Sequence, residues 1–218
     1  MLKYLCLNEY HKRMNSLKDL TNKLDNISGL RVVLLEVRCK MTNSYSINTI
    51  IEYLNKNHPD VKIKKNESRK YHEIYIDQKN KIKIYELRCV RIFGKNIDDI
   101  QKYVDTFINI AGLNKYCLFA FKPCFIACTI KNIFIDIEKI PLDLCKSFKL
   151  FTKIIYENIY IHVFNRENIP VGTIAIAGSN PDEIIDAYNF IYDFKSDIGT
   201  RYITSKDPLE VTDMVIEI

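Results

Sequence analysis

Apolar side chains recur along this chain with two periods, one of two residues and one of three to four. Alternation of apolar and polar residues is typical of a strand with one buried face, and steps of three and four are typical of an amphipathic helix. The period of two predicts strands at 31–41, 61–65, 71–77, 81–93, 128–132, 150–156, 159–164 and 171–178. The longer period predicts helices at 3–27, 47–55, 96–110 and 181–194, with a short proline-initiated helix at 140–145.

Polar capping residues mark where three of these helices begin. Ser46, Asn96 and Asn180 each precede an apolar-periodic run, and their side chains can accept a hydrogen bond from the first helical turn. Pro181 follows at a first helical position, where its fixed φ suits the helix. The stretch at 111–123 is expected to link two halves of the chain.

Two similar stretches indicate an internal repeat. Gly94-Lys-Asn-Ile-Asp-Asp-Ile matches Gly178-Ser-Asn-Pro-Asp-Glu-Ile, and an amphipathic helix follows each. An internal repeat determines the architecture of a chain, and here it predicts an α+β fold. We expect two copies of strand, helix, three strands, helix. Together they would form one curved antiparallel sheet covered on one face by the helices. The expected divisions are an N-terminal amphipathic helix, a first copy, a second copy and a tail, at 1–29, 30–112, 113–195 and 196–218. The N-terminal helix is expected to pack on the body; a separate docking surface is the alternative.

Composition is that of a globular protein and excludes few functions. The 218 residues are 47% hydrophobic and 27% charged, and the net charge of +5 fits a polyanionic partner or an ordinary basic protein equally well. Seven cysteines with irregular spacing and no CxxC pair predict a reduced intracellular compartment and no metal or other cofactor. The N-terminus becomes polar too early for a signal peptide, and no apolar run reaches the roughly 18 residues that a membrane span needs.

The strand pattern predicts a sheet face that no helix covers. Side chains alternate between faces, so apolar residues assign the opposite, free face to their neighbours. These neighbours are aromatic, small or basic: Tyr160, His162, Phe164, Thr173, Ala175, Ala177, Lys62 and Lys64. Such a face is either ordinary solvated surface or, because aromatics beside basic residues suit nucleic acids, a binding surface.

Four motifs of the second copy resemble the TATA-box-binding protein (TBP) family. Ile130-Lys-Asn132-Ile is similar to the family's Ile-Gln-Asn-Met/Ile, and Leu150-Phe-Thr-Lys-Ile-Ile-Tyr156 to Leu-Phe-Pro-Gly-Leu-Ile-Tyr. Ile161-His-Val-Phe164 resembles Leu-Leu-Ile-Phe, and Thr173-Ile-Ala-Ile-Ala-Gly178 resembles Lys-Val-Val-Leu-Thr-Gly. The resemblance covers roughly residues 31–195 and implies a saddle whose concave face binds the DNA minor groove.

The resemblance implies roles for particular residues. Asn132 stands where the family's asparagine reads the minor groove, and Phe151 and Phe164 stand where its wedge residues partly unstack base steps. The first copy departs from the family, because Arg38 lies near the place of that asparagine, and its basic residues are expected to contact phosphates. The complete expected DNA-binding set is Asn132, Phe134, Phe151, Phe164, Tyr160, His162, Thr173, Ala175, Ala177, Lys62, Lys64, Tyr75, Arg91 and Phe93.

The expected function is transcription initiation without catalysis. Expected partners are double-stranded A·T-rich promoter DNA and a transcription factor IIB-like factor or the RNA polymerase machinery, with altered docking because the family's acidic stirrup is here Lys146-Ser-Phe-Lys149. The divergence resembles that of the TBP-like proteins of large DNA viruses, so the expected location is the nucleus, or a virus factory in the host cytoplasm. One alternative is a protein-interaction module that has lost DNA binding. Another is an enzyme such as a glycosylase, which is disfavoured because the sequence shows neither a nucleophile–base pair nor a phosphate-cradling glycine loop.

Overall fold

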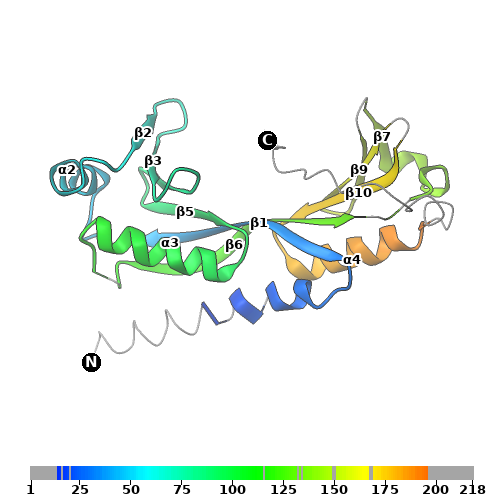
Figure 1. Ribbon diagram of the computed structural model, residues 1–218, viewed down its shortest axis with the longest axis horizontal. Helices are drawn as coiled ribbons and strands as arrows, with labels where there is room; N and C mark the ends of the chain where they lie inside the picture. Colours follow the sequence, from blue (N-terminus) through cyan, green and yellow to red (C-terminus); the bar gives the residue numbers. More distant parts are fainter. Residues whose placement is uncertain are drawn as a thin grey trace.

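One continuous antiparallel sheet organises the whole molecule (Figure 1). The computed structural model describes residues 14–195 apart from 16, 20, 115, 132, 134, 149, 150, 167 and 168, and the side chains of 165–166 and 169–172 are also outside this description. The 10-stranded sheet has the order β2-β3-β4-β5-β1-β6-β10-β9-β8-β7. The strands are β1 (Leu30–Met41), β2 (Ile63–Asn66), β3 (Tyr71–Tyr75), β4 (Lys81–Tyr85), β5 (Cys89–Gly94), β6 (Leu118–Lys131), β7 (Cys145–Ser147), β8 (Thr152–Tyr156), β9 (Ile159–Arg166) and β10 (Ile169–Gly178).

The strand register is arranged symmetrically about the central pair, β1 and β6. Leu35 of β1 is paired with Ile126 of β6; on their other sides, Leu35 pairs with Gly94 and Ile126 pairs with Gly178. The two similar glycine motifs therefore end β5 and β10 at matching places. The α+β class and the single antiparallel sheet are as the sequence predicts.

Each half has four strands between its helices, so the expected three is wrong. In the first half the expected strand 81–93 is divided into β4 and β5 by a turn, in which Arg88 has a φ of 58° and Leu87 is 93% exposed. Ile82, Ile84, Val90 and Ile92 are all fully buried and all even-numbered. The alternation thus continues across the turn, which hides the break from the sequence pattern.

The second half departs from the expected elements at its helix. In place of one helix at 140–145 there are two 3₁₀ turns, η1 (Ile137–Lys139) and η2 (Leu142–Leu144), followed by the unexpected edge strand β7. Pro141 cannot donate a backbone hydrogen bond, so one helix cannot continue through it from η1. A single-turn 3₁₀ element on each side is the result.

The stretch at 111–123 is not simply a link, because β6 begins at Leu118. Pro123 lies inside this strand, where the pairing with β1 shifts register between Glu36 and Val37. A bulge leaves a residue outside the ladder, and prolines inside sheets occur at such positions. A second irregularity lies nearby, where Ala120 has a φ of 57°.

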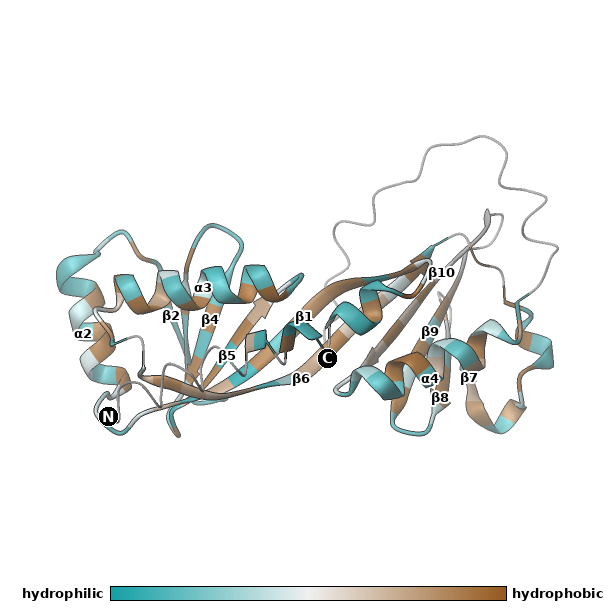
Figure 2. Cartoon of the chain, turned by 90° about the horizontal axis from the view of Figure 1, so that it is seen from below, coloured by the Kyte–Doolittle hydropathy of each residue, from teal (hydrophilic) through white to brown (hydrophobic). Residues whose placement is uncertain are grey.

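Helices α3 (Ile97–Ile110) and α4 (Pro181–Tyr192) cover one face of the sheet (Figure 1). The expected caps are confirmed: Asn96 accepts a hydrogen bond from the amide of Asp99, and Asn180 accepts one from the amide of Asp182. The short helix α2 (Ile47–Asn57) is capped by Ser46, whose side chain accepts a hydrogen bond from the amide of Thr49. These helices carry bands of both hydrophilic and hydrophobic residues (Figure 2).

The helical residues 17–19 and 21–25 pack across both halves on the helix side of the sheet. Leu17 and Leu24 are buried, Lys18 forms an ion pair with Asp98 of α3, and Lys23 forms one with Asp182 of α4. Of the two interpretations of this segment, packing on the body is the one observed for these residues. Within the described part of the chain, no helix combines the length and apolarity needed to cross a membrane.

Candidate nucleic-acid interface

The free sheet face lies on the side opposite α3 and α4. Both ends of the sheet, at β2–β3 and at β7–β9, rise away from these helices, so this face is concave (Figure 1). The expected alternation is found on β9, where Ile159, Ile161 and Val163 are buried in the core. Their neighbours, Tyr160, His162 and Phe164, consequently point to the concave face.

Four aromatic side chains form a connected group at the second-half end of this face, which we call the aromatic cluster: Phe148, Phe151, His162 and Phe164. The ring of Phe151 lies at its centre, with centroid distances of 4.9 Å to Phe148, 4.7 Å to His162 and 5.8 Å to Phe164. The amide of Phe148 also donates to the carbonyl of Phe151 at 2.9 Å. Such pairs stabilise one another by about 0.5–1.5 kcal/mol beyond burial.

Small side chains of β10 lie beside the aromatic residues. Thr173 is paired with Phe164, Ala175 with His162, and Ala177 with Tyr160. Because threonine and alanine are short, one side of each larger ring is left open toward the concave face. On the other side of β9, the Nζ of Lys153 lies 3.8 Å from the ring centroid of Tyr160.

The imidazole of His162 is held in its neutral form by its surroundings. Burial, with a smaller contribution from the charge of Lys153, lowers the pKa of His162 below its ordinary value. The pKa of a histidine is ordinarily about 6.5, so His162 is uncharged at neutral pH. On this face His162 is therefore an uncharged flat ring and not a cation.

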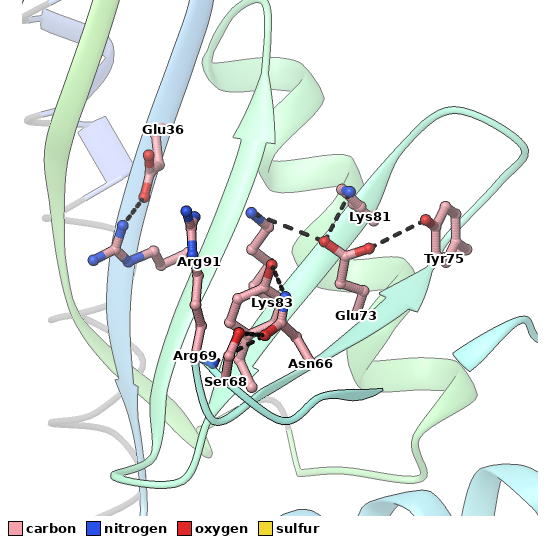
Figure 3. Close-up of polar contacts among 10 residues, drawn as sticks. Glu36, Asn66, Ser68, Arg69, Glu73, Tyr75, Lys81, Lys83 and Arg91 are labelled. Carbon is pink, nitrogen blue, oxygen red and sulfur yellow. Dashed lines mark hydrogen bonds and ion pairs between the residues drawn. The ribbon is translucent and has the colours of Figure 1, made fainter. Parts of the chain in front are cut away.

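The first half of the concave face is an ion-paired surface. One row of residues crosses four strands through Lys64, Glu73, Lys83 and Arg91. Glu73 accepts from Lys81 at 2.8 Å and from the hydroxyl of Tyr75 at 3.1 Å, and the Nζ of Lys83 is 3.9 Å away (Figure 3).

A second ion pair lies nearer the centre of the sheet. Arg91 donates to Glu36 at 2.9 Å (Figure 3). The guanidinium of Arg91 lies 5.0 Å from the ring centroid of Tyr85. Burial alone would lower the pKa of Arg91, but the charge of Glu36 raises it above the ordinary value. Arg91 is therefore charged at neutral pH.

Strand register also shows an aromatic pair that the sequence comparison did not find. Tyr71 is paired with Tyr85 across β3 and β4, and their ring centroids are 5.1 Å apart. Gly94 of β5 and Gly178 of β10 occupy matching places in the two halves. Counting outward from them along the paired strands places Tyr71 and Tyr85 where Phe151 and Phe164 lie in the second half. The sequence resemblance places the first wedge position of the first half at Lys62-Ile-Lys64 and the second near Tyr75. The register instead places Tyr71 and Tyr85 at these two positions, because only strand pairing fixes which residues are opposite.

Of the remaining expected site residues, some lie on the concave face and two lie outside the described residues. Phe93 lies on the concave face with the Nζ of Lys83 at 5.2 Å from its ring, and Tyr75 has Lys62 and Lys64 over its ring at 4.8 and 5.8 Å. Arg91 and Phe93 occupy the row positions of Ala175 and Ala177, as the alignment of the two glycine motifs predicts. Two further expected residues, Asn132 and Phe134, lie outside the described residues.

The described residues contain no group of three or more His, Cys, Asp or Glu side chains arranged to hold a metal ion. Burial raises the pKa of the Cys117, Cys124 and Cys128 thiols to about 12. Thiols of this kind are protonated at neutral pH and act as small apolar side chains.

Comparison with known proteins identifies the fold. No family model matches the chain, and no curated protein matches its sequence. Among solved structures, the TBP of Methanococcus jannaschii superimposes with a TM-score of 0.52 at 12% identity, over 76% of this chain and 98% of that chain. The chain has a TBP-like fold. A rolling circle replication initiator protein from Geobacillus stearothermophilus reaches a TM-score of only 0.34 at 10% identity, over 76% of this chain and 80% of that chain.

Proposed function

We propose that this chain is a DNA-binding transcription initiation factor that holds the minor groove of duplex DNA against its concave sheet face. The observation that supports the proposal is an aromatic cluster, flanked by small side chains, on the free face of a TBP-like sheet. Neither the fold nor the cluster alone would carry it, because folds are reused for many functions.

In the proposed complex, Phe151 and Phe164 partly unstack base steps at one end of the site. Unstacking costs a few kcal/mol for each step, and the bent duplex then contacts more of the protein surface. Asn132, on sequence resemblance, is proposed to read the central minor groove, where the hydrogen-bonding pattern distinguishes A·T from G·C pairs. No catalysis is proposed.

The proposed partners, besides DNA, are a transcription factor IIB-like factor or the RNA polymerase machinery. Docking would use the edge of the second half, where Phe148 is 53% exposed and Lys146 is exposed beside it. An acidic partner surface would suit this edge. We propose an intracellular site of action, in the nucleus or in a virus factory.

Duplex binding measured by fluorescence anisotropy tests the proposal. A TATA-containing duplex and a matched G·C-rich duplex would be titrated with the full chain, with energy transfer between dyes at the duplex ends reporting bending. Tighter binding of the A·T duplex, with bending, is the expected result. Absence of binding to either duplex at low salt would contradict the proposal.

A second candidate function is a protein-interaction module of a transcription complex that has lost sequence-specific DNA binding. The observation that favours it is the ion pairing of the first half, where Glu36 and Glu73 occupy cations that phosphates would otherwise contact. If neither duplex binds, capture of transcription factor IIB-like proteins is the corresponding test.

A further inference from the structure

Acidic residues are nearly absent from the strands of this sheet, and those present share one location. Among the strand sequences they are Glu36 of β1 and Glu73 of β3, whereas β6, β7, β8, β9 and β10 contain none. Both glutamates lie on the concave face of the first half, and both are only 9% exposed. Burial of an unpaired carboxylate is energetically costly, so each of these two glutamates needs a cationic partner.

Each glutamate is held by cations that point to the same face. Glu73 contacts the Nζ atoms of Lys81 and Lys83, and Glu36 contacts Arg91 (Figure 3). Arg91 is held down on the sheet, because its guanidinium lies over Tyr85 and its Nε is buried, with no hydrogen-bond partner found among the described residues. Burial would raise the pKa of Glu73, but Lys81, Tyr75 and Lys83 lower it below the ordinary value, so the carboxylate is charged at neutral pH.

We propose that Glu36 and Glu73 are built-in counter-ions that limit the affinity of the first half of the concave face for phosphate, and so set the balance between sequence-independent and sequence-dependent DNA binding. This proposal rests on the proposed function. Cations that neutralise phosphates supply the sequence-independent, salt-sensitive part of DNA affinity. Glu36 and Glu73 offset two of the three positive charges of Arg91, Lys81 and Lys83. The complex therefore depends more on the carboxylate-free strands and the aromatic cluster of the second half.

The test is the salt dependence of duplex binding for the full chain and for Glu36→Gln, Glu73→Gln and the double variant. Glutamine keeps the size of the side chain and one acceptor oxygen while removing the charge, and circular dichroism would verify folding. Each phosphate contact contributes about −0.9 to the slope of log affinity against log salt. Each cation released onto a phosphate should therefore increase the ratio of the Kd at 200 mM salt to the Kd at 50 mM by about 3.5-fold.

Two matched controls distinguish the release of particular cations from their glutamate partners from a general effect of the protein's net charge on the salt slope. Asp98→Asn removes a carboxylate from α3, on the opposite side of the sheet, and should leave the salt slope unchanged. Adding Arg91→Leu to Glu36→Gln restores the original net charge and should return the slope to that of the unmodified chain. An equal steepening in Asp98→Asn would overturn the proposal.

The outcomes distinguish this inference from the proposed function. If the unmodified chain binds duplex and the glutamine variants have the same salt slope, the counter-ion proposal is wrong while the proposed function stands. If the unmodified chain does not bind but the double variant does, the proposed function is wrong and the counter-ions are supported. If none of the proteins binds, both are wrong.

Discussion

At the scale of single residues, the chemistry of the concave face is set by what stands beside each aromatic ring. Phe164 has a partner ring, Phe151, on one side and only Thr173 on the other. Tyr85 occupies the matching place in the first half but is covered by the guanidinium of Arg91. An open ring can stack on a base, and a covered ring cannot do so without first losing its cation.

Replacing Phe164 with alanine should weaken duplex binding by about 1–3 kcal/mol, the contribution of a stacked ring. Anisotropy titration at fixed salt would measure it. Tyr192→Ala is the matched control, because Tyr192 is an exposed aromatic residue on α4, on the helix side. A folded Phe164→Ala protein with unchanged affinity would rule out the wedge role.

The neutral state of His162 predicts a titration midpoint below about 6.5, the ordinary value for histidine. Burial and Lys153 both disfavour the imidazolium in the folded protein. The unfolded chain therefore binds this proton more readily, and His162 lowers stability progressively as the pH falls below about 6.5. Nuclear magnetic resonance titration of the imidazole, assigned with His162→Gln, would show it; a midpoint above 6.5 would be inconsistent with this environment.

At the scale of elements, the two glycine motifs explain how each half passes from its last strand to its long helix. A Cβ on Gly94 would lie 2.9 Å from the Cβ of Asp99, and one on Gly178 would lie 2.2 Å from the Cδ1 of Ile159. Both distances are too short for a side chain. Glycine is therefore needed at both places because of close packing, which is why the motif occurs twice.

Gly178→Ala should consequently lower the free energy of unfolding by about 1–3 kcal/mol, the usual cost of overpacking. Ile159 is itself buried, so its side chain has little room to move. Urea denaturation would measure the change, with the exposed neighbour substitution Ser179→Ala as the control. Equal stabilities of the two variants would show that the β10–α4 corner relaxes freely.

At the scale of the whole molecule, a symmetrical strand order carries two unlike faces. The second half presents an aromatic cluster and strands free of carboxylates; the first presents ion pairs and the pair Tyr71–Tyr85, in which Tyr71 is only 5% exposed and accepts a hydrogen bond from Asn66. A duplex on the concave face is therefore expected to be deformed mainly at one end.

This asymmetry predicts different results for matched substitutions in the two halves. Phe164→Ala should abolish most of the bending measured by energy transfer, whereas Tyr85→Ala should leave most of it intact, because the tyrosine pair is held within the protein. The change in transfer efficiency would be compared at saturating protein. Equal losses of bending in the two variants would mean that both ends deform the duplex alike.

The local features of this protein follow from its amino-acid sequence. Periodicity gave most strands and helices and the buried side of β9 and β10, and the polar residues Ser46, Asn96 and Asn180 gave three helix starts, because these depend on neighbours within a few residues. The contacts of Tyr71 with Tyr85 and of Arg91 with Glu36 are seen only in the folded protein. The same is true of the bulge at Pro123. The hydrophobic pattern restricts the register between strands, but turn geometry and packing with partners far along the chain complete it, so the local pattern alone does not fix it.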